Sequence, residues 1–270
     1  MSLRSRGLRS PRAAAALAWM LWAAAPAPAQ DPGGVLREGE ELVYNVRYSF
    51  INLGQVRIRT IGRETLEGRT VFRCKAFIDS YPGVPFVDLH ATFESWLDTA
   101  FFSRRFVGKT LEDGSWDFSR YLFDYDAGRV IMETGTRDTA LSRSETTAVA
   151  GVMQDGLSLF FFARDRLRSG KAMDVPAVVR ESKVNTRLNF TNGRSSVEVD
   201  AVEGPVAVVA FDGAAEFVGI FGLTGEFEGW FSDDSARVPI LAKMKVIIGS
   251  ITLELMEWKR PGWTPPRGGA

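Results

Sequence analysis

The sequence predicts a mostly β protein, in which one large antiparallel sheet curls into a barrel-like or half-barrel form and one α-helix packs against it. Strand-like runs recur at roughly ten-residue spacing from Leu42 to Trp258, separated by turns that contain Gly or Asp. Apolar and polar residues alternate within these runs, so each strand has one face to bury. A single segment, residues 156–167, has the period of a helix instead.

The N-terminal residues predict export. Four arginines precede an apolar run, Ala13–Ala25, and an A-x-A-type cleavage site ends at Ala29. The run spans about thirteen residues, whereas a membrane-spanning helix needs roughly twenty. We therefore expect a signal peptide over residues 1–29 and a mature chain without a transmembrane segment, in the periplasm or associated with the outer membrane. An uncleaved N-terminal anchor is the alternative.

The mature chain is expected to form one domain. A flexible Pro/Gly leader is predicted over residues 30–37, a single β-rich domain over 38–258, and a disordered Pro/Gly tail over 259–270. The full chain has 33 basic and 33 acidic residues, and removal of the four signal-peptide arginines leaves 29 against 33, a net charge of −4. This balance argues against a nucleic-acid partner.

The strands begin with a hairpin, Leu42–Tyr48 and Gln55–Thr60, around a turn at Gly54. Further strands are expected at residues 71–78, 92–97, 101–110, 116–125, 129–134, 184–190, 195–201, 206–211, 226–232, 238–246 and 251–258. The pair Asn192-Gly193 predicts a hairpin turn between two of them. The glycines at 219, 222, 225 and 229 predict tight curvature or close backbone packing.

The helix is predicted over residues 156–167, with Asp155 as its N-cap and Gly170 closing it. Its aromatic stripe indicates burial, and we expect it to plug the concave face of the sheet. The residues that share this stripe are Leu157, Phe160, Phe161 and Arg164.

Four motifs in order resemble the bacterial envelope family called domain of unknown function 3108. They are Gly39–Tyr44 followed by Leu53-Gly54, Phe93–Asp98, Gln154–Phe161, and Gly229–Asp234 followed by Arg237–Ile240 and Gly249–Ile251. The resemblance spans residues 38–256, and Gly156 stands where a proline is common. It implies an exported β-rich domain, often predicted to be secreted or outer-membrane associated, and it implies no activity.

No catalytic, cofactor-binding or metal-ligating constellation is predicted. The sequence has a single histidine, His90, and no G-x-S-x-G motif that would supply a nucleophile for it. We expect His90 to form a hydrogen bond with a nearby acidic residue at the rim of the sheet. The single cysteine, Cys74, permits no internal disulfide and is expected to be a buried small apolar residue. Gly108-Lys109-Thr110 lacks the earlier glycine of a P-loop, because Ser103 stands there.

Carboxylate pairs leave a glycoside or ester hydrolase as the weakest of three hypotheses. The pairs are Glu94 with Asp98 and Asp233 with Asp234, and the second is more simply explained as a turn that caps backbone amides. The chain is therefore predicted not to be an enzyme, and no cofactor is expected.

Two candidate surfaces remain. A cavity between helix and sheet is predicted to hold a lipid or other hydrophobic ligand, lined by Leu157, Phe160, Phe161, Trp96 and Trp230. A basic patch is predicted either to face an anionic membrane surface or to be a solvated face balanced by nearby glutamates, and it comprises Arg47, Arg57, Arg59, Arg73 and Lys75. The first hypothesis is thus a non-catalytic protein that binds a lipid or an envelope or outer-membrane component. The second is a structural or assembly scaffold with a fully packed core.

Overall fold

A computed structural model describes residues 34–84, 87–112, 114–137, 140–216, 223–246 and 249–269. The predicted signal peptide and the start of the predicted leader lie outside these residues. All described residues belong to one compact unit, Asp31–Ala270. No helix among them is long and apolar enough to cross a membrane.

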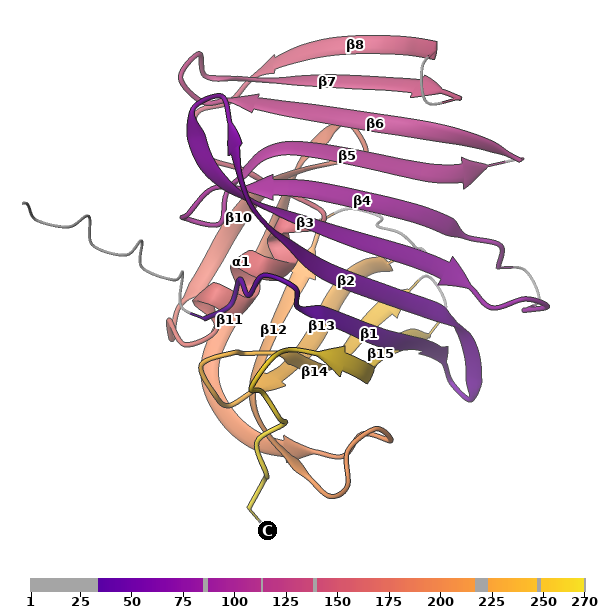
Figure 1. Ribbon diagram of the computed structural model, residues 1–270, viewed down its shortest axis with the longest axis vertical. Coiled ribbons are helices and arrows are strands. Elements are labelled where there is room, and N and C mark those ends of the chain that lie inside the picture. The colour runs from indigo at the N-terminus through magenta and orange to yellow at the C-terminus, as the bar shows by residue number, and fades with distance from the viewer. Residues whose placement is uncertain are drawn as a thin grey trace, which may run out of the picture. The chain divides into compact units, whose positions relative to one another are not determined.

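The described residues form one antiparallel sheet, open at both edges, and one helix (Figure 1). The order of the strands in the sheet is β8-β7-β6-β5-β4-β3-β2-β1-β15-β14-β13-β12-β11-β10-β9, so the first strand pairs with the last. Only the short β9 runs parallel to its neighbour. The strands are β1 (Glu41–Tyr48), β2 (Ile51–Leu66), β3 (Arg69–Ser80), β4 (His90–Leu97), β5 (Ser103–Glu112), β6 (Ser115–Asp124), β7 (Arg129–Thr136), β8 (Ala140–Ala148), β9 (Gln154–Asp155), β10 (Ala172–Val179), β11 (Ser182–Val197), β12 (Val206–Ala215), β13 (Leu223–Ser232), β14 (Pro239–Val246) and β15 (Ser250–Lys259). The predicted mostly β class and curled antiparallel sheet are confirmed.

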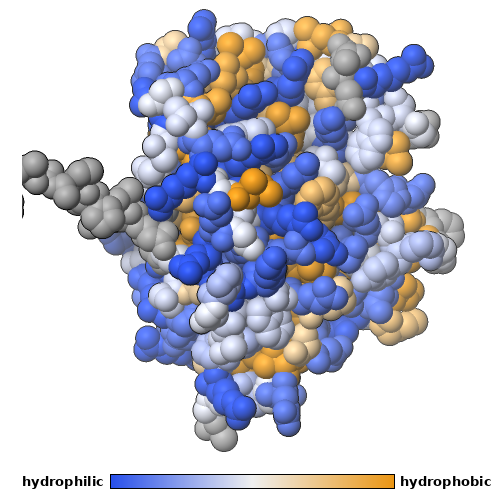
Figure 2. Space-filling view, in the orientation of Figure 1, coloured by the Kyte–Doolittle hydropathy of each residue, from blue (hydrophilic) through white to orange (hydrophobic). Residues whose placement is uncertain are grey.

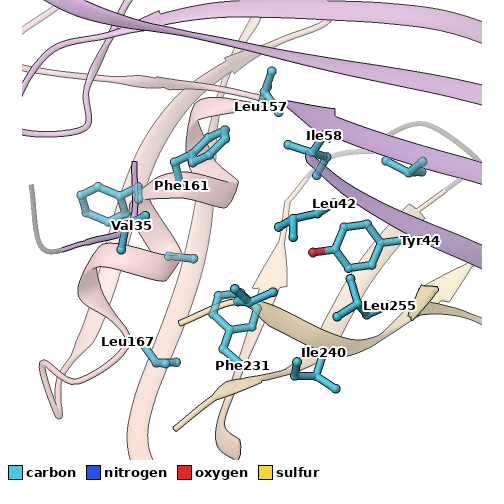
Figure 3. Close-up of a cluster of buried hydrophobic side chains, with 14 of the residues drawn as sticks. Val35, Leu42, Tyr44, Ile58, Leu157, Phe161, Leu167, Phe231, Ile240 and Leu255 are labelled. Carbon is cyan, nitrogen blue, oxygen red and sulfur yellow. The ribbon is translucent and has the colours of Figure 1, made fainter. Parts of the chain in front are cut away.

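The helix α1 (Ser158–Arg166) lies against the concave side of the curled sheet (Figure 1). It is shorter than the predicted 156–167, because Gly156 and Leu157 form a turn before it. Phe161 and Leu167 have no exposed surface. Figure 3 shows the side chains of Phe161, Leu167 and labelled residues of β1, β2 and β13–β15 directed toward a common interior.

Close packing of aromatic rings on backbone explains the glycines of β12 and β13. A Cβ on Gly229 would lie 2.3 Å from the ring of Phe211, and one on Gly213 would lie 2.4 Å from the ring of Phe227. These rings therefore lie flat on the inner face of the neighbouring strand, and only glycine leaves room for them. The predicted close packing is confirmed at Gly229.

The hairpin predicted at Asn192-Gly193 is wrong. β11 continues through these residues without reversing direction, and it pairs with β12 both before and after them. The register shifts between Phe190 and Gly193, and Asn192 has a φ of 57°. An Asn-Gly pair satisfies a β-bulge as well as a turn, because both need a residue that tolerates positive φ.

The described parts of the predicted leader and tail, residues 34–37 and 259–269, make defined contacts where flexibility and disorder were predicted. In the leader, Val35 and Leu36 are buried in the main hydrophobic cluster. In the tail, the Trp263 indole Nε1 donates a 2.7 Å hydrogen bond to Asp234, and the backbone N–H of Gly268 donates to Pro205. A Pro/Gly composition allows a chain to lie along a surface in a fixed path when side chains such as Trp263 anchor it.

Candidate ligand-binding cavity

A large cavity lies between α1 and the inner face of the sheet. Its volume is about 990 Å³, and most of the side chains that line it are apolar. They come from strands that are far apart in the sequence and include Val56, Ile58, Phe93, Leu188, Phe211 and Leu253. The volume is at the upper end of the range of about 300–1,000 Å³ that is typical of ligand sites. A cavity of this lining favours apolar ligand atoms over water.

One wall of the cavity is α1. Leu157, Phe160 and Ala163 line it, and the ring of Phe160 lies 6.5 Å from that of Phe231 on β13. Because α1 has only nine residues, its own backbone hydrogen bonds are too few to hold it in place. Two buried polar clamps fix its ends.

The first clamp is Asp155, which is fully buried at the N-terminal end of α1. Its Oδ1 accepts hydrogen bonds from the backbone N–H groups of Leu157 and Ser158, both at 2.8 Å, and from the hydroxyl of Ser95 at 2.7 Å. Its Oδ2 accepts from the hydroxyl of Ser103 at 2.5 Å. Burial raises the pKa of this carboxyl, and the four donors act in the opposite direction. Asp155 thus ties the helix to β4 and β5.

The second clamp is Arg164, which has no exposed surface and extends from the last turn of α1. Its guanidinium donates to both oxygens of Glu40, at 2.7 and 3.2 Å, and to the carbonyls of Ala236 and Arg237. Burial alone would lower the pKa of Arg164, but the Glu40 carboxylate beside it raises it overall. Arg260 also pairs with Glu40. The helix is therefore fixed at both ends, and the cavity wall is formed in advance of any ligand.

The turn between β10 and β11 forms part of the cavity wall beside β6. Its two residues, Arg180 and Glu181, have φ values of 49° and 57° and line the cavity. Glu181 accepts hydrogen bonds from Ser119 at 2.6 Å and from the Tyr121 hydroxyl at 3.0 Å. Burial and the adjacent Glu181 charge raise the pKa of Tyr121. These bonds hold a strained turn against β6.

Of the five predicted cavity residues, two line the cavity and three do not. Leu157 and Phe160 line it, whereas Phe161 is fully buried in the packed core beside it. Trp96 and Trp230 are on the outer face of the sheet: the Trp96 indole donates to Glu64, and the Lys243 ammonium lies 5.6 Å from the ring centre of Trp230. Alternation explains the error, since Ser95 and Phe231 point inward and each tryptophan is one residue away.

The predicted basic patch lies on the outer face and is largely neutralised. Arg47 pairs with Glu254 at 3.0 Å, Arg57 and Arg59 both pair with Glu41, and Arg73 pairs with Glu64 and Glu94. The ammonium of Lys75 lies 5.0 Å from the ring centre of Phe77. Figure 2 shows a mixed, mostly hydrophilic surface in the orientation of Figure 1. The arrangement is that of a balanced, solvated face and gives no free positive patch.

The remaining candidates have structural partners. His90 contacts Asp79 at 2.9 Å and Asp88 at 3.4 Å, as predicted for a rim residue, and Asp79 raises its pKa. Cys74 is fully buried, which raises the pKa of its thiol. The carboxylate of Asp98 pairs with Arg104.

In the turn predicted to cap backbone amides, Asp234 accepts from the N–H groups of Ala236 and Arg237, whereas Asp233 pairs with Arg168 and Arg194. The described residues contain no group of three metal-ligating side chains.

Sequence reasoning missed the polar part of the cavity wall. Val175–Val179 and Ser182–Leu188 are strand-like runs two residues apart, which indicates a two-residue hairpin loop. The loop residues are Arg180 and Glu181, which carry none of the usual Gly or Asn signal for positive φ. The inward direction of Asp117 could have been found from strand alternation on β6.

Comparison with known proteins supports the fold and the family. The sequence profile of the family described as "Protein of unknown function (DUF3108)" matches residues 43–256. No curated protein matches the chain. A crystal structure described as a β-barrel-like protein of domain of unknown function DUF1849 from Brucella abortus is similar, with a TM-score of 0.55 and 12% identity. The match covers 83% of this chain and 98% of that one, and at this identity it shows the fold alone. The chain belongs to the DUF3108 family.

Proposed function

We propose that this protein is an exported, non-catalytic binding protein that holds a lipid or similar hydrophobic molecule between α1 and the sheet. The observation that carries this proposal is the preformed cavity of about 990 Å³ with its mostly apolar lining. Burial of apolar ligand surface there contributes about 25 cal/mol per Å². Because the clamps at Asp155 and Arg164 already fix α1, little of that free energy is lost in ordering the site.

The cavity weighs against the alternative of a scaffold with a fully packed interior. Protein interiors are normally close-packed, and voids larger than a water molecule are few. A protein that works only through its outer surface gains nothing from a space of this size, since each unfilled void costs stability. The outer face also carries mutually paired charges, as at Arg57 and Glu41, so the predicted basic patch offers a partner little free charge.

The binding test compares two tryptophan substitutions on neighbouring residues of β14. Ala242 lines the cavity, whereas Lys243 is exposed on the outer face. Ala242→Trp should fill part of the cavity and weaken binding of a fluorescent fatty-acyl probe by at least about tenfold, which corresponds to about 1.4 kcal/mol. Lys243→Trp should bind the probe like the parent protein. Equal binding by both variants, with thermal unfolding unchanged, would place the probe outside the cavity.

Export is tested separately, because it rests on the N-terminal sequence and not on the cavity. We expect the protein in the periplasmic or envelope fraction of expressing cells, with Gln30 as the first residue of the mature chain. If the protein were found in the cytoplasm with residues 1–29 retained, the proposed location would be wrong. The proposed ligand binding would still be tested by the probe experiment.

A further inference from the structure

A group of polar residues lines the part of the cavity wall that is formed by β5, β6 and β7. Thr110 on β5, Asp117 on β6 and Thr136 on β7 pair directly across the strands. Two residues further along the strands, on the same face, the next row consists of Gly108, Ser119 and Thr134. All six line the cavity. The walls formed by α1, β2, β12 and β15 are apolar, and a second, smaller charged group on β13 and β14 comprises Glu226, Glu228 and Lys245. The cavity is therefore amphipathic, with a polar patch facing an apolar interior.

Two opposite charges at this patch have no partner. Among the described residues, the side chains of Asp117 and Arg180 have no hydrogen-bond or ion-pair partner, although both residues line the cavity. Their neighbour Glu181 is already engaged by Ser119 and Tyr121. The other described cation of the lining, Lys245, pairs with Glu226. The patch therefore presents one available cation and one available carboxylate.

The capacity of the cavity matches two acyl chains. A methylene group occupies about the volume of one water molecule in the liquid, about 30 Å³, so 990 Å³ accommodates roughly thirty such groups. One fatty acid of ordinary length would fill about half of this space, and the unfilled part would forfeit its dispersion contacts.

We propose, on the basis of the proposed function, that the ligand is a two-chain phospholipid with a zwitterionic phosphate–amine headgroup. The acyl chains fill the apolar interior beside Leu157 and Phe160. The headgroup phosphate contacts Arg180, whose planar guanidinium suits phosphate oxygens, and the amine contacts Asp117. The threonine hydroxyls at 110, 134 and 136 supply further hydrogen-bonding groups to the headgroup.

The charges of the patch favour a zwitterionic headgroup over a purely anionic one. An anionic headgroup would be attracted by the guanidinium of Arg180 but repelled by the carboxylates of Asp117 and Glu181. A headgroup without phosphate would leave Arg180 unmatched. Selectivity among lipids thus comes from repulsion as well as attraction, and each of the two charges makes a separate contribution.

The test uses three lipids with identical acyl chains that compete against a fluorescent acyl probe for the purified full chain. The lipids are dioleoyl phosphatidylethanolamine, dioleoyl phosphatidylglycerol and dioleoylglycerol, and tail-free glycerophosphoethanolamine is the soluble control. The parent protein should prefer the first lipid over each of the others by about tenfold, the effect of one charge-assisted hydrogen bond. The soluble headgroup should not compete at the same concentration.

Two variants then separate the contributions of the two charges to lipid selectivity. Asp117→Asn should make the zwitterionic and anionic lipids bind equally, whereas Arg180→Gln should remove the preference for dioleoyl phosphatidylethanolamine over dioleoylglycerol. Both residues lie at the surface of the cavity wall, and unchanged thermal unfolding shows that each variant is folded. If all three lipids bind the parent protein equally, the headgroup inference is wrong and the proposed function survives. If none binds, the proposed function itself fails. Displacement by glycerophosphoethanolamine alone would overturn the assignment to a lipid.

Discussion

Replacement of Asp155 tests the buried clamp that holds the cavity wall. Asp155→Ala leaves four donors without their acceptor: the amides of residues 157 and 158 and the hydroxyls of Ser95 and Ser103. A buried donor left unsatisfied costs about 1–3 kcal/mol. The two hydroxyls can rotate toward other acceptors, so the amides dominate the cost. We expect a loss of about 3–5 kcal/mol in the free energy of unfolding.

The assay is urea unfolding followed by tryptophan fluorescence, and the matched control is Asp79→Ala. Asp79 also accepts a hydrogen bond, from His90, but its side chain is 49% exposed. An exposed pair of this kind contributes about 0–1 kcal/mol. Asp155→Ala should therefore lower the unfolding midpoint strongly, and Asp79→Ala should barely move it.

A graded series identifies the cause. Asp155→Asn keeps one acceptor oxygen for the two amides and should lose about 1–2 kcal/mol, and Ser95→Ala, which removes one charged hydrogen bond, should lose a similar amount. In thermal unfolding, the melting temperature of Asp155→Ala should be lower than that of the parent protein by about 10 °C, since 1 kcal/mol corresponds to about 2–4 °C for a protein of this size. Equal stabilities of the Asp155 and Asp79 alanine variants would refute the reasoning that burial makes Asp155 a clamp.

Three further predictions concern other parts of the molecule. His90 is the only histidine, and the midpoint of its proton NMR titration should lie above pH 6.5 and fall toward the ordinary value in Asp79→Asn. The small stability that this pair contributes is present below pH 6.5 and is lost as the pH rises through the raised pKa of His90. An unshifted midpoint would contradict the pairing. Gly229→Ala should cost about 1–3 kcal/mol in urea unfolding because its Cβ would meet the ring of Phe211 at 2.3 Å. The matched control is Gly151→Ala, whose Cβ would meet no atom within 4 Å and whose φ is not positive, so the free energy of unfolding should barely change. Trp263→Ala should make the tail after Arg260 accessible to proteases, since it removes the bond to Asp234 and the ring contact with Trp258; unchanged proteolysis would show that the tail is held by other contacts.

The fold was accessible from sequence wherever alternation was uninterrupted. Tyr44 and Val46 alternate with Asn45 and Arg47, and the structure buries both apolar side chains. Trp96 and Trp230 were misplaced because their size was given more weight than alternation, which puts their neighbours Ser95 and Phe231 on the inner face. Size indicates what a residue would gain from burial, but strand parity decides which side it faces.

The site was less accessible because its residues depend on long-range contacts. Asp155 could be identified as a helix cap, but its hydroxyl donors come from β4 and β5 and have no sequence signal of their own. The ion pair of Glu40 and Arg164 joins residues 124 positions apart. The volume of the cavity depends on the curl of the whole sheet, which no local pattern specifies. The Pro/Gly tail is held by Trp263 and by backbone hydrogen bonds to residues 205 and 207, which its composition does not reveal.

Native mass spectrometry of the protein isolated gently from the envelope, followed by lipid extraction, tests the central claim most directly. We predict one lipid bound per chain in the parent protein and in Lys243→Trp, and a clearly lower occupancy in Ala242→Trp, which narrows the cavity. The extracted lipid should carry two acyl chains. A ligand-free mass for the parent protein, together with an inability to take up added lipid, would contradict the claim that the space between α1 and the sheet is a binding site.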